Sequence, residues 1–90
     1  MGTETQKVIG KILTSPAKTA IVATLSKEGK VQFSDLQEAL QTTNGNLNYH
    51  LLDLQNDGIV QKNSDGAWVL SGQGTKVSST VRNIVKSSTE

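Results

Sequence analysis

The sequence contains no cysteine, and its 90 residues include a single histidine, His50. Disulfide bonds and thiolate metal sites are therefore excluded, and one imidazole cannot build a zinc or iron centre by itself. We expect neither a metal nor a cofactor. The sequence also lacks an apolar run long enough to span a bilayer, and polar residues with Lys7 interrupt any signal-peptide pattern at the start. We therefore expect a cytoplasmic protein that does not use a membrane.

A marked excess of charge of either sign is also missing, because 9 Lys+Arg are balanced by 8 Asp+Glu. Any positive patch that binds nucleic acid must then come from uneven distribution of these charges. There is no Ser/His/Asp set, no carboxylate pair beside a candidate acid or base, and no phosphate-binding glycine loop. We therefore expect a protein that is not an enzyme. The length allows one domain with a single modest core.

The stretch from Thr42 to Val60 predicts one capped amphipathic helix that leads directly into a strand. Thr43 is expected to cap this helix by accepting the Asn46 N–H, and Asn56-Asp57-Gly58 supplies a C-terminal stop. One stripe at helical spacing should be buried, and it consists of Leu47, Leu51 and Leu54.

The opposite face of the same helix is polar but scarcely charged. We expect it to point outward with Gly45, Asn48, Tyr49, Leu52, Asp53 and Asn56. A helix that is merely solvated usually carries Lys and Glu, whereas amides and a tyrosine can pair with base edges or phosphates. This face therefore suggests a DNA-recognition helix, although the asparagines at its start also suit simple capping chemistry.

Before this helix, the sequence predicts three further helices and a short strand. Residues 5–14 place apolar pairs one helical turn apart, and Ser15-Pro16 then caps and starts a second helix that runs to about Lys27. A short strand is expected at 31–33, with Phe33 pointing into the core. Ser34 is expected to form a capping box with Gln37 and to open a third helix.

After the recognition helix, two short runs rich in Val, Ile and Trp predict strands at 59–63 and 67–70. Ser64-Asp65-Gly66 lies between them and marks a tight hairpin. Ser71 can cap a last helix that reaches about Lys86. An apolar stripe on that helix consists of Val77, Val81, Ile84 and Val85.

This order of elements resembles the winged helix-turn-helix DNA-binding domains of ArsR- and MarR-like transcriptional regulators. The resemblance covers Ser15 to Val77, and it rests on SPAKTAIVATL, FSDLQEALQTTNGNLNYHLLDLQNDGIV and WVLSGQGTKV taken together. It implies a mainly α fold with a small β-hairpin (α+β), as one winged-helix domain over 1–90. The helix-turn-helix would span about 34–57, the wing about 59–70, and the C-terminal helix about 72–86.

By this resemblance, the helix at 44–57 enters the major groove of double-stranded DNA and the hairpin lies along the backbone or minor groove. The protein would be a small transcriptional regulator. The expected DNA-binding residues are Thr43, Asn44, Asn46, Asn48, Tyr49, Leu52 and Lys62. The alternative is a winged-helix module that binds protein through Tyr49 and Leu52.

A homodimer is expected because the first and last helices carry more apolar surface than one small domain needs to cover. The expected interface consists of Val8, Ile9, Ile12, Leu13, Val81, Ile84 and Val85. Among the remaining side chains, we expect His50 to be a boundary histidine satisfied by a hydrogen bond, and Trp68 to pack in the core. Four basic residues are expected to be solvated charges unless the fold clusters them into phosphate contacts: Lys18, Lys30, Lys62 and Arg82.

Overall fold

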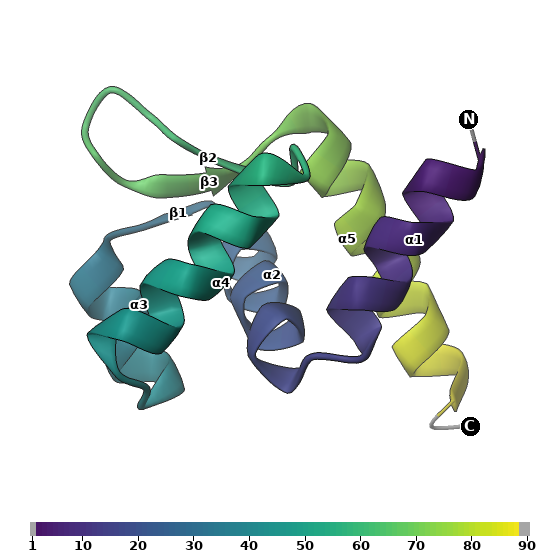
Figure 1. Ribbon diagram of the computed structural model, residues 1–90, viewed down its shortest axis with the longest axis horizontal. Coiled ribbons are helices and arrows are strands. Elements are labelled where there is room, and N and C mark those ends of the chain that lie inside the picture. The colour runs from purple at the N-terminus through teal and green to yellow at the C-terminus, as the bar shows by residue number, and fades with distance from the viewer. Residues whose placement is uncertain (1, 89–90) are drawn as a thin grey trace.

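Over the residues that the structure describes, the fold consists of five helices and a small antiparallel sheet (Figure 1). The computed structural model describes residues 2–88, and it describes side chains over residues 6–83. The predicted class, mainly α with a small β element, is therefore confirmed. The elements are α1 (Gly2–Leu13), α2 (Pro16–Glu28), β1 (Lys30–Val31), α3 (Phe33–Leu40), α4 (Asn44–Asn56), β2 (Val60–Lys62), β3 (Trp68–Leu70) and α5 (Gly72–Ser88).

Helix α2 is the centre of the domain, because it contacts each of the other four helices as well as β1 and β3. It begins as the sequence predicts: the Ser15 hydroxyl accepts the Lys18 N–H, and Pro16 occupies the first helical position. Ile21, Val22 and Leu25 are buried. A helix packed on several sides needs more apolar surface than one narrow stripe, which explains why Val22 is buried together with Ile21 and Leu25.

The sheet has three strands in the order β1-β3-β2, so that β3 lies in the middle. Val31 pairs with Trp68 on one side of β3, and Lys62 pairs with the same residue on the other side. The predicted hairpin is present, with Gly66 N donating to Asn63 O at 3.0 Å in its turn. Trp68 is buried in the core, as expected.

The entry to α3 differs from the prediction. The strand at this point ends at Val31, and Phe33 is already the first residue of the helix, with Gln32 as N-cap. Ser34 therefore lies inside the first turn, and the predicted capping box is wrong because the N-cap position makes no side-chain hydrogen bond. Phe33 still packs against the core.

The start of α5 is held tightly against Ile59, the residue before β2. Ser71 N donates to Ile59 O at 2.9 Å, and the Ser71 hydroxyl accepts the Gly74 N–H at 2.9 Å. Ser71 is thus the predicted cap of the helix. A Cβ on Gly74 would lie 1.9 Å from Ile59 O, which means that only glycine allows this close approach.

The apolar stripes of α1 and α5 are largely used inside the single chain. Ile12, Val77 and Val81 are buried in the core, and Val8 and Ile9 pack partly buried against it. The premise that these stripes exceed what one domain can cover is therefore corrected, because α1, α2 and α5 pack on one another. In the predicted interface, Leu13 is 37% exposed. Ile84 and Val85 lie outside the residues whose side chains the structure describes.

No single helix among residues 2–88 has the length and apolar composition needed to cross a membrane. The helical segments Gln6–Leu13 and Pro16–Glu28 reach that length and apolar composition only in combination, and the angle between them is 105°.

Candidate nucleic-acid interface

Helix α4 forms as the sequence predicts, from its cap to its last turn. The Thr43 hydroxyl accepts the Asn46 N–H at 3.2 Å, and Leu47, Leu51 and Leu54 are fully buried. At the other end Gly58 has a φ of 77°, a left-handed conformation that glycine adopts without a steric cost. This turn sends the chain directly into β2.

One side of α4 is open to solvent and carries no charged group. We call it the outward face, and it consists of Gly45, Asn48, Tyr49, Leu52 and Asn56. Tyr49 is 64% exposed and Leu52 is 46% exposed, which are large values for side chains with this much apolar surface. The helix lies at the front of the molecule in Figure 1, with α2 behind it. The face therefore presents amides, a phenol and an aliphatic group to a partner.

The remaining predicted DNA contacts fall in two places. Thr43, Asn44 and Asn46 are exposed at the start of α4, and Lys62 is exposed on β2. The Thr43 hydroxyl is already engaged as the helix cap, but its exposure leaves it accessible. The Lys62 ammonium lies 5.4 Å from the centroid of the Trp68 ring, so the side chain runs across the sheet.

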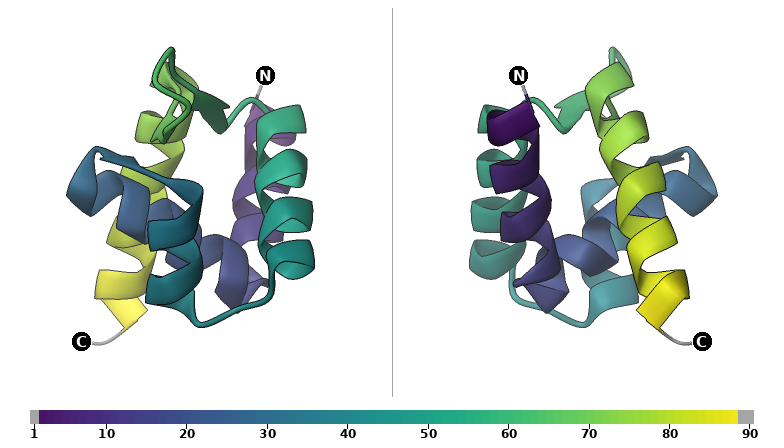
Figure 2. Two further views of the ribbon diagram at one scale, coloured as in Figure 1. Left: turned by 90° about the vertical axis from the view of Figure 1, so that its left-hand side faces the viewer. Right: turned by 90° about the vertical axis from the view of Figure 1, so that its right-hand side faces the viewer.

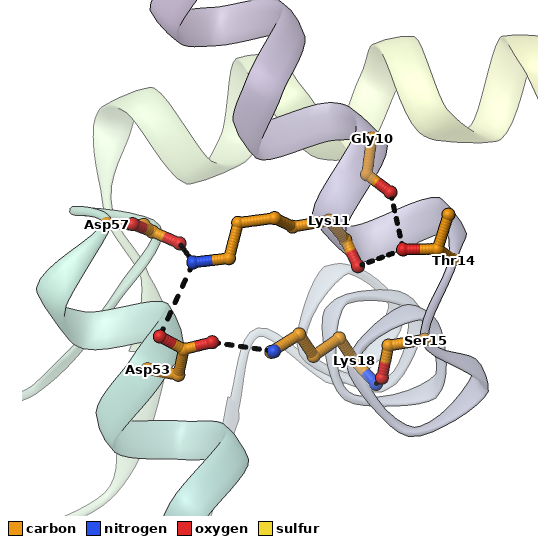
Figure 3. Close-up of polar contacts among 7 residues, drawn as sticks. All are labelled: Gly10, Lys11, Thr14, Ser15, Lys18, Asp53 and Asp57. Atoms are coloured by element: carbon orange, nitrogen blue, oxygen red, sulfur yellow. Dashed lines mark hydrogen bonds and ion pairs between the residues drawn. The ribbon is translucent and has the colours of Figure 1, made fainter.

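A second side of α4 faces α1 and α2. Asn46, His50, Asp53 and Asp57 follow each other at intervals of three or four residues and so share this side, which we call the lysine-facing edge. The expectation that Asp53 points outward is therefore wrong. Its carboxylate is bound by lysines from both neighbouring helices (Figure 3).

Three ion pairs connect this edge to the rest of the domain. Lys18 Nζ lies 2.6 Å from Asp53 Oδ2, Lys11 Nζ lies 3.4 Å from Asp53 Oδ1, and the same ammonium lies 2.8 Å from Asp57 Oδ2. The hydrogen bond from Lys18, together with both ammonium charges, lowers the pKa of Asp53. The hydrogen bond to Asp57 raises the pKa of Lys11. The pairing with lysine thus favours the charged form of the Asp53 carboxylate.

Lys18 is not the solvated charge that the sequence suggests, because it is only 7% exposed. A buried ammonium requires a partner to offset its lost hydration, and Asp53 provides one. The ammonium also lies 5.8 Å from the centroid of the Tyr49 ring. Lys18 therefore contacts two residues of α4 that are one helical turn apart.

His50 lies on the lysine-facing edge between Asn46 and Asp53, and the hydrogen bond expected for it is not seen at Nδ1. Its Nδ1 is buried without a partner among the described residues. Burial, and then the positive charge of Lys18, lower the pKa of His50, against a smaller opposing effect of Asp53. The ring packs edge-on against Tyr49 with the centroids 5.2 Å apart. The imidazole therefore acts as a packing group beside Tyr49.

Positive charge does not gather on the segment from the start of α3 to the end of α4. Residues 33–58 contain four acids and no Lys or Arg: Asp35, Glu38, Asp53 and Asp57. Elsewhere Lys30 Nζ lies 3.2 Å from Asp65 Oδ2, and Arg82 Nη2 donates to Ser26 Oγ at 2.5 Å. Phosphate contacts would therefore have to come from the sheet and neighbouring helices, rather than from α4 itself.

The side chains that sequence reasoning missed are Lys11 and Lys18. The available signal was that Asp53 and Asp57 are the only charges on an otherwise uncharged helix, so their partners had to come from other elements. Within the described part of the chain, no group of three or more His, Cys, Asp or Glu side chains is placed to hold a metal ion.

Comparison with known proteins places this fold in a family without assigning it an activity. Residues 8–81 match the family described as "Domain of unknown function (DUF7347)", a range that runs from α1 into α5. None of the curated proteins matches the chain. Because the match covers most of the sequence, the chain belongs to the DUF7347 family.

Proposed function

We propose that this protein is a winged helix-turn-helix domain that binds double-stranded DNA in the cytoplasm as a small dimeric transcriptional regulator. The observation that carries the proposal is the outward face of α4, which exposes uncharged hydrogen-bonding groups on the second of two consecutive helices, just before a β-hairpin. Such a face suits the major groove, which admits one α-helix and presents base edges to it.

Three side chains on the outward face have chemically suitable partners in the major groove or at its edge. The Asn48 amide can both donate to and accept from an adenine edge, and the Tyr49 hydroxyl can reach a base or a phosphate. Leu52 can contact a thymine methyl group. The hairpin would lie against the backbone, where Lys62 would pair with a phosphate. The helix reads the sequence in this arrangement, and the hairpin adds affinity.

The test is fluorescence polarisation with labelled genomic fragments at two salt concentrations, with a scrambled fragment of equal length as control. We expect specific binding with a mild salt dependence, equivalent to about two to four phosphates per subunit, because few cations lie near α4. A steep dependence of the affinity on salt would show that cations away from α4 contact the phosphates. Equal affinity for all fragments would contradict sequence-specific recognition.

The proposed dimer is best tested at Leu13, which is exposed, since Ile12 and Val81 serve the monomer core. Light scattering at micromolar concentration should give the mass of two chains. Leu13→Glu should reduce that mass while leaving the melting temperature close to that of the parent. Lys76→Glu, an exposed position on α5, is the matched control. A monomer mass for the parent would contradict the dimer.

A second candidate is a protein-binding module. The exposure of Tyr49 and Leu52 favours it, because exposed aromatic and aliphatic groups without nearby free cations suit a protein surface. The Tyr49→Ala and Leu52→Ala variants distinguish the two candidates. If they bind DNA as the parent does and melt normally, the recognition role fails, and the protein-binding reading becomes the better account.

A further inference from the structure

The charged side chains of α4 would oppose its approach to DNA. Between Asn44 and Gly58 the charged side chains are two acids, Asp53 and Asp57, and there is no base. A carboxylate within a Debye length of the phosphates, about 8–10 Å at ordinary salt, repels them. Asp57 also lies at the negative end of the helix dipole, where an unpaired acid is unfavourable.

Lysines of α1 and α2 neutralise the two carboxylates of α4. Lys11 Nζ lies 2.8 Å from Asp57 and 3.4 Å from Asp53, and Lys18 Nζ lies 2.6 Å from Asp53. Two ammonium groups thus neutralise two carboxylates. Figure 3 shows both lysines reaching α4 from the side, so that the pairs lie along the lysine-facing edge. The outward face is left without charge.

Lys18 also fixes the direction in which α4 presents that face. It is buried, and a buried lysine whose partner moved away would lose the interaction that offsets its lost hydration. Rotation of α4 about its axis would carry Asp53 away from Lys18 and Lys11 together. The ion pairs therefore oppose rotation, and they keep Tyr49 directed outward.

We propose that Lys11 and Lys18 are positioning and charge-masking residues for DNA binding, which act by neutralising Asp53 and Asp57 and by fixing the rotation of α4, without touching DNA. This inference rests on the proposed function. It predicts that the affinity depends on the balance of charge at the lysine-facing edge, rather than on the number of lysines available to phosphates.

The experiment is a double-substitution cycle at Lys11 and Asp57, measured by polarisation on the DNA fragment that the parent binds. The Lys11 side chain is 44% exposed, so its removal should leave folding intact, which a thermal melt checks. Lys11→Met should weaken binding about three- to tenfold at low salt, and less at high salt because the exposed carboxylate is screened. Lys11→Arg should restore parental affinity, since it keeps the charge.

The decisive variant is the double substitution Lys11→Met with Asp57→Asn. If Lys11 masks a carboxylate, the double variant should bind about as tightly as the parent, because the charge that required masking is gone. If Lys11 instead contacts a phosphate, the double variant should stay as weak as Lys11→Met, and the inference is overturned. Lys76→Met changes the net charge equally at an exposed position on α5, and it should bind as the parent does.

Lys18→Met tests the buried pair but carries a risk of unfolding, because it leaves Asp53 with one weaker partner. Pairing it with Asp53→Asn removes that unpaired charge, and the double variant should melt closer to the parent than Lys18→Met alone.

The proposed DNA-binding function and the proposed charge-masking role fail in different ways. A parent that binds no DNA removes both of them, whereas a parent that binds while Lys11→Met has no effect overturns only the masking role.

Discussion

The first turns of α4 and α5 are built by the same local chemistry, but the first is open to solvent and the second is packed against backbone. Each helix is capped by a hydroxyl, from Thr43 at 3.2 Å in α4 and from Ser71 at 2.9 Å in α5, and each carries a glycine in its first turn. A Cβ on Gly45 would meet nothing within 4 Å, whereas one on Gly74 would lie 1.9 Å from Ile59 O. The two helices lie on opposite sides of the molecule (Figure 2).

This difference separates a region available for binding from one used for folding. The start of α5 is closed by the backbone of Ile59 and is fixed by the hydrogen bonds of Ser71. In α4 the leucine stripe is the side that packs into the core, whereas the outward face is exposed to solvent. A capped helix start therefore does not by itself indicate a functional surface, because packing decides which start is exposed.

The largest change in stability is expected from a substitution on the buried side of α4. Leu51→Ala should reduce the free energy of unfolding by about 2 to 5 kcal/mol, because Leu51 is fully buried and its truncation leaves a cavity. Chemical denaturation measures this change. DNA binding should be lost only to the extent that the domain unfolds. Leu52→Ala, at an exposed position, is the matched control for the change in the free energy of unfolding.

A second effect compares the two glycines directly. Gly74→Ala should cost about 1 to 3 kcal/mol or more, because the new methyl group collides with backbone that cannot rotate away. Gly45→Ala should stabilise the domain by about 0.5 to 1 kcal/mol, since alanine suits an open helix position better. Thermal melts of both variants check the contrast. Similar melting temperatures would show that the two helix starts are not packed differently.

A third effect tests whether the open side of α4 binds anything. Asn48→Ala and Tyr49→Ala should each weaken specific DNA binding by about 1 to 3 kcal/mol, while the melting temperature stays almost unchanged because both side chains are exposed. Polarisation measures the affinity. Gln55→Ala, also exposed on α4, should have a smaller effect if recognition is centred on the outward face.

The smallest effect concerns pH and the lysine-facing edge. The pKa of His50 is lowered in the folded state by burial and then by Lys18, with Asp53 opposing, so the unfolded chain binds the proton more readily. The stability that this provides is complete above the ordinary histidine pKa of about 6.5, and it is lost as the pH falls below that value. Denaturation between about pH 7 and pH 5 should show a decline that His50→Gln reduces.

The sequence alone determined the local elements of this domain. Hydroxyls at Ser15, Thr43 and Ser71 marked three helix starts, and the leucine spacing of α4 identified its buried stripe, because caps and helical periodicity act between residues close in the chain. The capping box at Ser34 failed because packing in the core overrode the local pattern. Phe33 packs against the core and belongs to the helix, so the N-cap is Gln32, two positions earlier than the local pattern indicates.

Only the tertiary structure decided what covers each face. Periodicity marked Ile12 and Val81 as apolar, but it could not show that α1, α2 and α5 bury them within one chain. It also could not pair Lys18 with Asp53, or close Gly74 against Ile59, because each of these contacts joins segments far apart in the sequence. Burial, ion pairing and backbone contact depend on distance in space, and a pattern within one segment carries no information about the segment that packs on it.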